Sequence, residues 1–127
     1  MTSEEVQVER RKHKRFRVQD GAFVVPKMSD GGAGRFKEIS MNGLRFEYAV
    51  SQEQSIEVTE LGIYVSYSGF RLYGIPCKPI WDFVIYEVPA TSLQIRQCGM
   101  EFGELTPQQA SQLEYFIQNH TISKAQV

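Results

Sequence analysis

The feature of this chain that most constrains its fold is a succession of short apolar runs, separated by turn-forming residues, between Phe16 and Phe102. Eight Phe and six Tyr residues add to the β propensity of the sequence. Short strands with turns at regular intervals are typical of a small antiparallel barrel or sandwich. A chain of 127 residues is long enough to bury one hydrophobic core, so we expect a single domain of mainly β structure.

The turn residues place the expected strands along the chain. The first strand contains Val18 and residues 22–25, is interrupted at Asp20-Gly21, and ends at Pro26 because proline cannot donate a hydrogen bond to a sheet. Residues 40–43 form a tight connection, since Asn-Gly is a strong hairpin signal. The other strands are expected at residues 35–39, 44–48, 55–58, 62–67, 70–75, 80–88, 93–95 and 98–102.

One helix is predicted near the C-terminus. Thr106 is a favourable N-cap, Pro107 is a favourable first helical residue, and Gln109 completes a capping box with Thr106. The apolar residues that follow recur at helical spacing, so the helix should pack on the sheet and end near Asn119. Its apolar face consists of Ala110, Leu113, Phe116 and Ile117.

Positive charge is concentrated in residues 9–17, which we call the basic segment. Six of its nine residues are Arg or Lys and one is Glu, which gives +5 in a chain of net charge −1 and leaves −6 for the rest. Concentrated cations attract anions, and arginine binds phosphate through two parallel hydrogen bonds. Three interpretations are open: a solvated tail, an arm on a nucleic-acid backbone, or a site for a discrete phosphorylated ligand. Arg11 and Arg15, four residues apart, can converge on one small anion, which favours the third interpretation.

Glu38-x-Ser40-x-x-Gly43 is a second group of candidates. Ser40 offers a hydroxyl, Gly43 permits close approach of a backbone, and Glu38 can accept hydrogen bonds from the N1–H and N2–H₂ groups of guanine. Turn chemistry alone also accounts for these residue types, with Glu38 in solvent. Trp81, the only tryptophan, is either a buried strand residue or an aromatic at a groove edge that stacks on a base or an arginine.

The sequence offers little for catalysis or metal binding. His13 and His120, the only histidines, have no partner at the spacing of a metal site, so we expect no enzyme, metal or cofactor. Cys77 and Cys98 are expected to be buried thiols in a reducing compartment, with a disulfide as the alternative. No stretch is apolar enough to span a membrane and no secretory signal is recognisable, which predicts a cytoplasmic protein.

In their order, these motifs resemble those of the PilZ family of bacterial cyclic di-GMP receptors. The marks of that family are RxxxR, often preceded by another arginine, and then [D/N]xSxxG further along the chain. This chain has Arg10-Arg11-x-x-x-Arg15 and then Glu38-x-Ser40-x-x-Gly43. Residues 98–102 and the helix after them are similar to the family's last strand and closing helix. The resemblance covers about residues 10–118.

The resemblance implies a six-stranded antiparallel PilZ-type barrel with a C-terminal helix that closes one end. We expect residues 1–9 to be a flexible lead-in and residues 10–118 to be the domain. Within it, residues 10–17 would be a switch segment and residues 106–119 the closing helix, followed by a tail at 120–127.

In the PilZ family the RxxxR segment is a flexible switch that folds over the ligand on the barrel. Carried over, Arg11 and Arg15 would hold phosphates and guanine edges of cyclic di-GMP, and Arg10 would assist. Ser40 and Gly43 would line the opposite wall.

Two further residues complete the expected site. Trp81 would be an additional lining residue. Position 38 departs from the family pattern, since Glu stands where Asp or Asn is expected. Its extra methylene displaces the carboxylate and can weaken a bidentate contact by ~1–3 kcal/mol.

The resemblance therefore predicts a non-enzymatic receptor that binds cyclic di-GMP and relays binding to an unidentified protein effector. The process that it controls, such as motility or biofilm formation, is left open. One alternative is a degenerate PilZ module that binds only a protein, with Glu38 as its mark. A less favoured alternative is a small barrel whose basic arm binds RNA or DNA.

Overall fold

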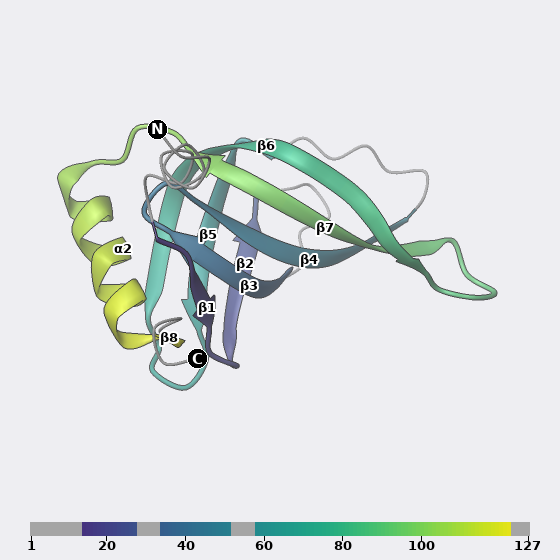
Figure 1. Cartoon of the computed structure of the whole chain (residues 1–127), viewed down its shortest axis with the longest axis horizontal. Helices are drawn as coiled ribbons and strands as arrows, with labels where there is room; N and C mark the ends of the chain where they lie inside the picture. The colour runs from purple at the N-terminus through teal and green to yellow at the C-terminus, as the bar shows by residue number, and fades with distance from the viewer. Residues whose placement is uncertain (1–13, 28–33, 52–57, 123–127) are drawn as a thin grey trace, which may run out of the picture.

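The structure, a computed structural model, describes residues 14–27, 34–51 and 58–122. These residues form strands and one helix, and the helix lies between the last two strands of the chain (Figure 1). The elements are β1 (Phe16–Val18), β2 (Ala22–Pro26), β3 (Gly34–Ser40), β4 (Gly43–Ser51), β5 (Glu60–Val65), β6 (Arg71–Glu87), β7 (Leu93–Phe102), α2 (Pro107–Asn119) and β8 (Thr121–Ile122).

Six of the strands close into a barrel. They follow one another in the order β2, β5, β6, β7, β4 and β3, and a further pairing between β2 and β3 closes the ring. All of these pairings are antiparallel. The predicted six-stranded antiparallel barrel with a C-terminal helix is therefore confirmed.

The core of the barrel follows from the alternation of side chains along the strands. On β2, Ala22 and Val24 are buried while Phe23 and Val25 are exposed. β4 alternates in the same way over most of its length, and Phe46 is fully buried at its centre. Successive strand residues point to opposite faces, so this pattern puts one apolar face of each strand inside the barrel.

Helix α2 closes one end of the barrel (Figure 1). Thr106 Oγ1 accepts a hydrogen bond from the backbone N–H of Gln109, and Gln109 Oε1 accepts one from the backbone N–H of Thr106. The predicted capping box is thus present. Leu113 and Phe116 of the predicted apolar face are fully buried, and Phe116 stacks on Phe36 of β3 at a centroid distance of 5.4 Å.

Two pairs of predicted strands prove to be single long strands, so the predicted breaks between them were wrong. Residues 70–75 and 80–88 are joined in β6, and 93–95 and 98–102 are joined in β7. β6 continues past Pro79 because its register with β7 shifts there, and a bulge is a place where a sheet tolerates proline.

One predicted strand is only partly covered by the structure. Residues 55–57 of the strand expected at 55–58 lie outside the described residues, and Val58 is not part of a strand.

The first and last strands attach to the outside of the ring. β1 pairs with β3, with Arg17 opposite Glu38. A turn at residues 19–21 then separates β1 from β2. β8 pairs with β1, so residues 121–122 form a strand. The β1–β3 pairing carries Arg15 to the barrel surface beside Glu38.

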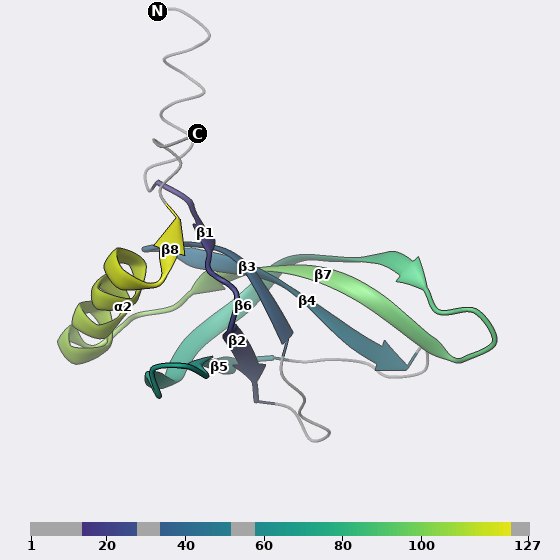
Figure 2. The same ribbon diagram turned by 90° about the horizontal axis from the view of Figure 1, so that it is seen from below.

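A long hairpin projects from the barrel on the side away from α2 (Figures 1 and 2). It consists of β6 and β7, and the end of β4 runs alongside β7 as far as Ser51 opposite Leu93. We call residues 80–95 of this hairpin the arm. Among the described residues, no helix has the length and apolar character needed to cross a membrane.

Candidate functional site

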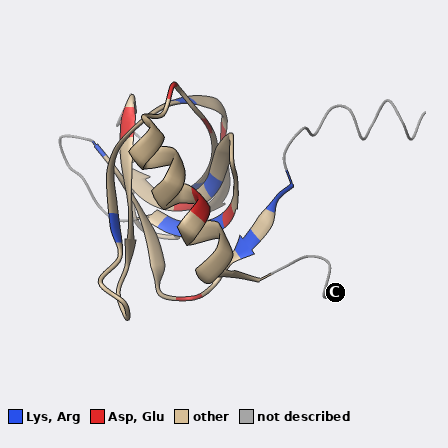
Figure 3. Ribbon diagram, turned by 90° about the vertical axis from the view of Figure 1, so that its left-hand side faces the viewer, with Lys and Arg blue, Asp and Glu red and all other residues tan. Residues whose placement is uncertain are grey.

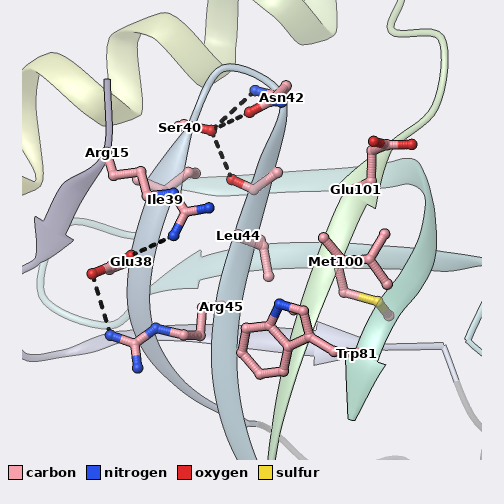
Figure 4. Close-up of a pocket in the computed structure, with 13 residues that line it drawn as sticks. Arg15, Glu38, Ile39, Ser40, Asn42, Leu44, Arg45, Trp81, Met100 and Glu101 are labelled. Carbon is pink, nitrogen blue, oxygen red and sulfur yellow. Dashed lines mark hydrogen bonds and ion pairs between the residues drawn. The ribbon is translucent and has the colours of Figure 1, made fainter. Parts of the chain in front are cut away.

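A half-open recess of about 80 Å³ lies on the barrel surface, where the β3–β4 turn meets β6 and β7 (Figure 4). Every predicted site residue that the structure describes lines it. These residues are Arg15, Glu38, Ser40, Gly43 and Trp81. Arg10 and Arg11 lie outside the described residues. Residues that the motifs selected from distant parts of the chain thus meet in one place.

The turn between β3 and β4 forms one end of the recess. Ser40 is buried, and its hydroxyl donates to Oδ1 of Asn42 at 2.5 Å and accepts from the backbone N–H of Asn42 at 3.3 Å. These bonds hold the turn closed, which makes the wall rigid.

This turn differs from the one that Asn-Gly usually forms. Ser40 pairs with Gly43, so Met41 and Asn42 are the central residues, and neither has a positive φ. The type I′ turn favoured by Asn-Gly requires a positive φ at both central positions. The tight connection predicted for residues 40–43 is present, but the Asn-Gly pair is not at its centre.

A neighbouring strand, rather than the turn, requires glycine at position 43. A β-carbon on Gly43 would overlap the backbone carbonyl oxygen of Met100 on β7. β4 and β7 therefore approach each other closely under the recess, and glycine is the residue that permits this.

Glu38 joins two arginines at the recess (Figure 4). It lies opposite Arg45 across the hairpin, and its Oε2 is 3.3 Å from Nη2 of Arg45. Its Oε1 is 3.8 Å from Nη1 of Arg15. The Arg15 side chain is 45% exposed and that of Glu38 only 17%. Exposed ion pairs at such distances are weak, so Arg15 is the more easily exchanged of the two partners.

Trp81 forms a side wall of the recess. Its indole packs over Gly99 of β7, where a β-carbon would overlap the ring. Phe83 stacks on the indole at a centroid distance of 5.3 Å. Trp81 is half-buried: it packs on the sheet and also lines the recess.

Both signs of charge border the recess. Glu101 lies at its rim and pairs with Lys78 at 3.3 Å, while Arg15 and Arg45 face Glu38. Figure 3 shows further basic residues on β1 and on the chain that enters it. Arg15 and Arg45 share Glu38, and Lys78 neutralises Glu101, so these charges leave a net of about +1 and a strongly anionic ligand requires additional cations.

Sequence reasoning missed several lining residues, of which Arg45 is the most important. A two-residue turn at 41–42 pairs Ser40 with Gly43 and therefore Glu38 with Arg45, so the hairpin register could have revealed it. The register of β6 against β7, which is interrupted by bulges, was not readable from the sequence. The lining residues missed on the turn and the strands are Ile39, Asn42, Leu44, Arg45, Ile80, Gly99, Met100 and Glu101.

Outside the recess, the two cysteine thiols are buried in the barrel. Cys77 and Cys98 are free and buried, as predicted. Burial raises the pKa of the Cys77 thiol to about 11 and that of the Cys98 thiol to about 12. Within the ranges that the structure covers, no group of three or more His, Cys, Asp or Glu residues is arranged to hold a metal ion.

A polar network links the arm to the barrel. Asp82 accepts a hydrogen bond from the Tyr48 hydroxyl through Oδ2 and one from Arg96 Nε, at 2.9 Å, through Oδ1. Burial, together with the hydrogen bond to Asp82, raises the pKa of the Tyr48 hydroxyl above its ordinary value.

No known protein family and no curated protein matches this sequence. Solved structures do match the fold. The PilZ domain of YcgR from Escherichia coli, solved with c-di-GMP, aligns with a TM-score of 0.66 and 15% identity over 87% of this chain and 91% of that chain. The MrkH–c-di-GMP complex of K. pneumonia aligns with a TM-score of 0.60 and 13% identity over 86% of this chain and 51% of that chain. The PlzA protein of Borreliella burgdorferi in complex with c-di-GMP aligns with a TM-score of 0.53 and 12% identity over 96% and 60%.

The closed antiparallel barrel, its single closing helix and the recess beside the β3–β4 turn define a small β-barrel domain with a surface site. The matches to solved structures identify which kind of small β-barrel this is. This chain has the PilZ fold, as the order of its motifs predicted. It spans about half of MrkH and less than two thirds of PlzA.

Proposed function

We propose that this chain is a non-enzymatic cytoplasmic receptor that binds cyclic di-GMP in the recess and relays binding to a protein effector. One observation carries the proposal: the described residues selected by the motifs line a single recess. The structural neighbours reported above were solved with c-di-GMP, which supports the same ligand for this fold.

The basic segment would supply charge to the ligand. Cyclic di-GMP carries two phosphates, and arginine meets a phosphate with paired, charge-assisted hydrogen bonds. Arg15 would leave Glu38, an ion pair worth at most ~1 kcal/mol at this exposure, for the stronger contact with phosphate. Arg11 would hold the second phosphate or a guanine edge, with help from Arg10.

The barrel would supply a rigid wall. Ser40 and Asn42 close the turn through their own hydrogen bonds, and the close approach at Gly43 fixes β4 against β7. A preformed wall lowers the entropy cost of binding. Trp81 offers an aromatic face to a guanine, and such stacking contributes ~1–3 kcal/mol per base.

Relay to the effector would follow from a change in the residues of the basic segment that precede β1, because Phe16 and Arg17 are already paired with β3. A ligand held between residues 10–15 and the barrel would shift these residues towards one conformation. An effector protein would recognise the ordered segment together with the rim of the recess. This is a shift in population that involves no covalent step.

Titration calorimetry with cyclic di-GMP tests the proposal. The wild-type chain should bind, and both Arg11→Ala and Arg15→Ala should abolish the heat of binding. Arg71→Ala is the matched control, because Arg71 packs over Tyr64 at 5.4 Å and does not line the recess. Absence of heat and of a thermal shift for the wild type at high micromolar ligand would overturn the receptor function.

The ion pairs of Glu38 favour a second candidate, a PilZ module that binds only a protein. Its carboxylate is engaged by Arg15 and Arg45, and it replaces the shorter acid or amide of the family pattern. Glu38→Asp separates the two candidates. A gain in affinity for cyclic di-GMP would indicate a receptor with a weakened site, whereas no binding by either form would favour the protein-binding module.

A further inference from the structure

The recess is too small to enclose a cyclic dinucleotide. Its volume is about 80 Å³, whereas pockets that enclose drug-sized ligands measure roughly 300–1,000 Å³. A cyclic dinucleotide that places one base in the recess therefore leaves its second base on the neighbouring surface of the barrel. The outer faces of β4, β6 and β7 provide that surface beyond Trp81.

Side chains on these three strands form rows across the outer face of the sheet. Arg45, Gly99 and Trp81 lie opposite one another and form the row at the recess (Figure 4). Strand residues two apart point to the same face and lie ~7 Å from each other, so the next row adjoins the recess on the same face. We call it the second row, and it consists of Glu47, Gln97 and Phe83.

The second row combines an aromatic ring with hydrogen-bonding groups. Phe83 is 48% exposed and stacks on Trp81, so the aromatic surface continues out of the recess. Glu47 Oε2 accepts a hydrogen bond from Gln97 Nε2 at 3.4 Å and lies 3.8 Å from Lys37 Nζ. Both of these contacts with described residues use Oε2, so Oε1 can accept further hydrogen bonds.

The row on the other side of the recess is less suited to a base. It consists of Ser40, Gly43, Glu101 and Lys78. These four residues include no aromatic ring, and Lys78 pairs with Glu101 at 3.3 Å. Proteins bind an unpaired base by stacking it on an aromatic ring and by hydrogen bonds to its edge. Of the two rows that flank the recess, the second row is the one that offers both.

We propose that the second row is a subsite for the other guanine of cyclic di-GMP, which rests on the proposed function placing the first guanine in the recess. Phe83 stacks on the base, and Glu47 accepts hydrogen bonds from its N1–H and N2–H₂ groups. Gln97 holds the carboxylate in place through its own hydrogen bond. Adenine has neither of these donors and presents an acceptor at N1, so this subsite selects guanine.

Calorimetry with two ligands tests the selectivity of the subsite. The probes are cyclic di-GMP and cyclic GMP–AMP, in which adenine replaces one guanine. The wild type should bind cyclic di-GMP at least about tenfold more tightly, as expected for two hydrogen bonds to a base edge. Glu47→Gln should lose most of this preference, because the adenine can then occupy the altered row. Release of Lys37 acts on the phosphates of both ligands alike, so the ratio of affinities isolates the base contact.

The stacking contact is tested by Phe83→Ala, which should weaken binding of both ligands at least about fivefold. Val84→Ala is the matched control. Val84 is 40% exposed on the same strand, and consecutive strand residues point to opposite faces, so this variant should bind both ligands as the wild type does. Thermal melting by circular dichroism must show that each variant is folded.

The outcomes separate the subsite from the receptor function. A wild type without preference between the two ligands, a preference that survives Glu47→Gln, or equal losses in the Phe83 and Val84 variants would each overturn the subsite. The receptor function would stand in those cases as long as cyclic di-GMP binds and Arg15→Ala abolishes binding. A wild type that binds neither ligand would overturn the receptor function, and the subsite with it.

Discussion

Glu38 and Arg45 face each other across the β3–β4 hairpin, with 3.3 Å between a carboxylate oxygen and a guanidinium nitrogen. Arg15 reaches the other carboxylate oxygen from 3.8 Å. Glu38 is therefore shared by one arginine that the barrel holds and one that enters from the basic segment. When Arg15 moves to a ligand, Arg45 still neutralises Glu38, so the exchange leaves no unpaired charge in the recess.

This relationship predicts that Arg45→Ala weakens binding of cyclic di-GMP. Without Arg45, the ion pair between Glu38 and Arg15 strengthens and holds Arg15 back from the phosphate. The expected loss is about fivefold to tenfold, or ~1 kcal/mol, measured by calorimetry. Arg71→Ala should bind as the wild type does. An affinity for the Arg45 variant equal to or above that of the wild type would contradict the shared role of Glu38.

Gly43→Ala should destabilise the whole barrel. The added methyl group meets a backbone carbonyl on β7, and strands cannot separate without loss of packing. We expect a decrease in the free energy of unfolding of ~2–3 kcal/mol by urea denaturation. Gly69→Ala is the control, because a β-carbon at Gly69 would meet no other atom. The only cost there is backbone strain, since Gly69 has a φ of +72°. That control should cost ~1 kcal/mol, and equal losses in the two variants would argue against the close contact at Gly43.

The sequence was sufficient to predict those elements whose signals lie within a few neighbouring residues. The capping box of Thr106 and Gln109 predicted both the first residue of α2 and the two hydrogen bonds that cap it, since both partners lie within one turn of helix. Ser40 and Gly43 marked a turn for the same reason. The motif residues also predicted which part of the barrel would carry the recess.

What the sequence could not provide was long-range register. The continuity of β6 depends on bulges that absorb Pro79, and a bulge is stabilised by the partner strand rather than by local residues. Trp81 meets Gly99 only because β7 takes one particular register against β6. Arg45 was the exception, because a short turn fixes the register of its own hairpin.

Gly99→Ala should displace the indole of Trp81. The new methyl group overlaps the ring, which can rotate away because it is a side chain rather than a backbone atom. Trp81 is the only tryptophan, so its fluorescence should shift to the red as the ring moves into water. We expect a stability loss of no more than ~1.5 kcal/mol, together with weaker binding of cyclic di-GMP. An unchanged emission spectrum would show that the indole does not rest on Gly99.

His120 should make the fold sensitive to mild acid. The residue is 6% exposed and packs among aromatic rings; its Nδ1 lies 3.0 Å from the Tyr67 hydroxyl, and its buried Nε2 has no hydrogen-bond partner. Burial lowers the pKa of His120 from its ordinary value of 6.5, so the folded state favours the neutral ring. The unfolded chain then binds a proton that the folded chain resists. Stability is fully present above pH 6.5 and decreases as the pH falls from there toward the lowered pKa of the folded state.

The measurement is urea denaturation at about pH 7.5 and about pH 5.5, on either side of the ordinary histidine pKa. The wild type should lose stability at the lower pH, and His120→Phe, which suits the aromatic surroundings, should lose clearly less. His13→Gln, which removes the other histidine, is the matched control and should behave like the wild type. A wild type that is equally stable at both pH values, or a His120 variant with the full acid-induced loss, would contradict a neutral buried imidazole at the end of α2.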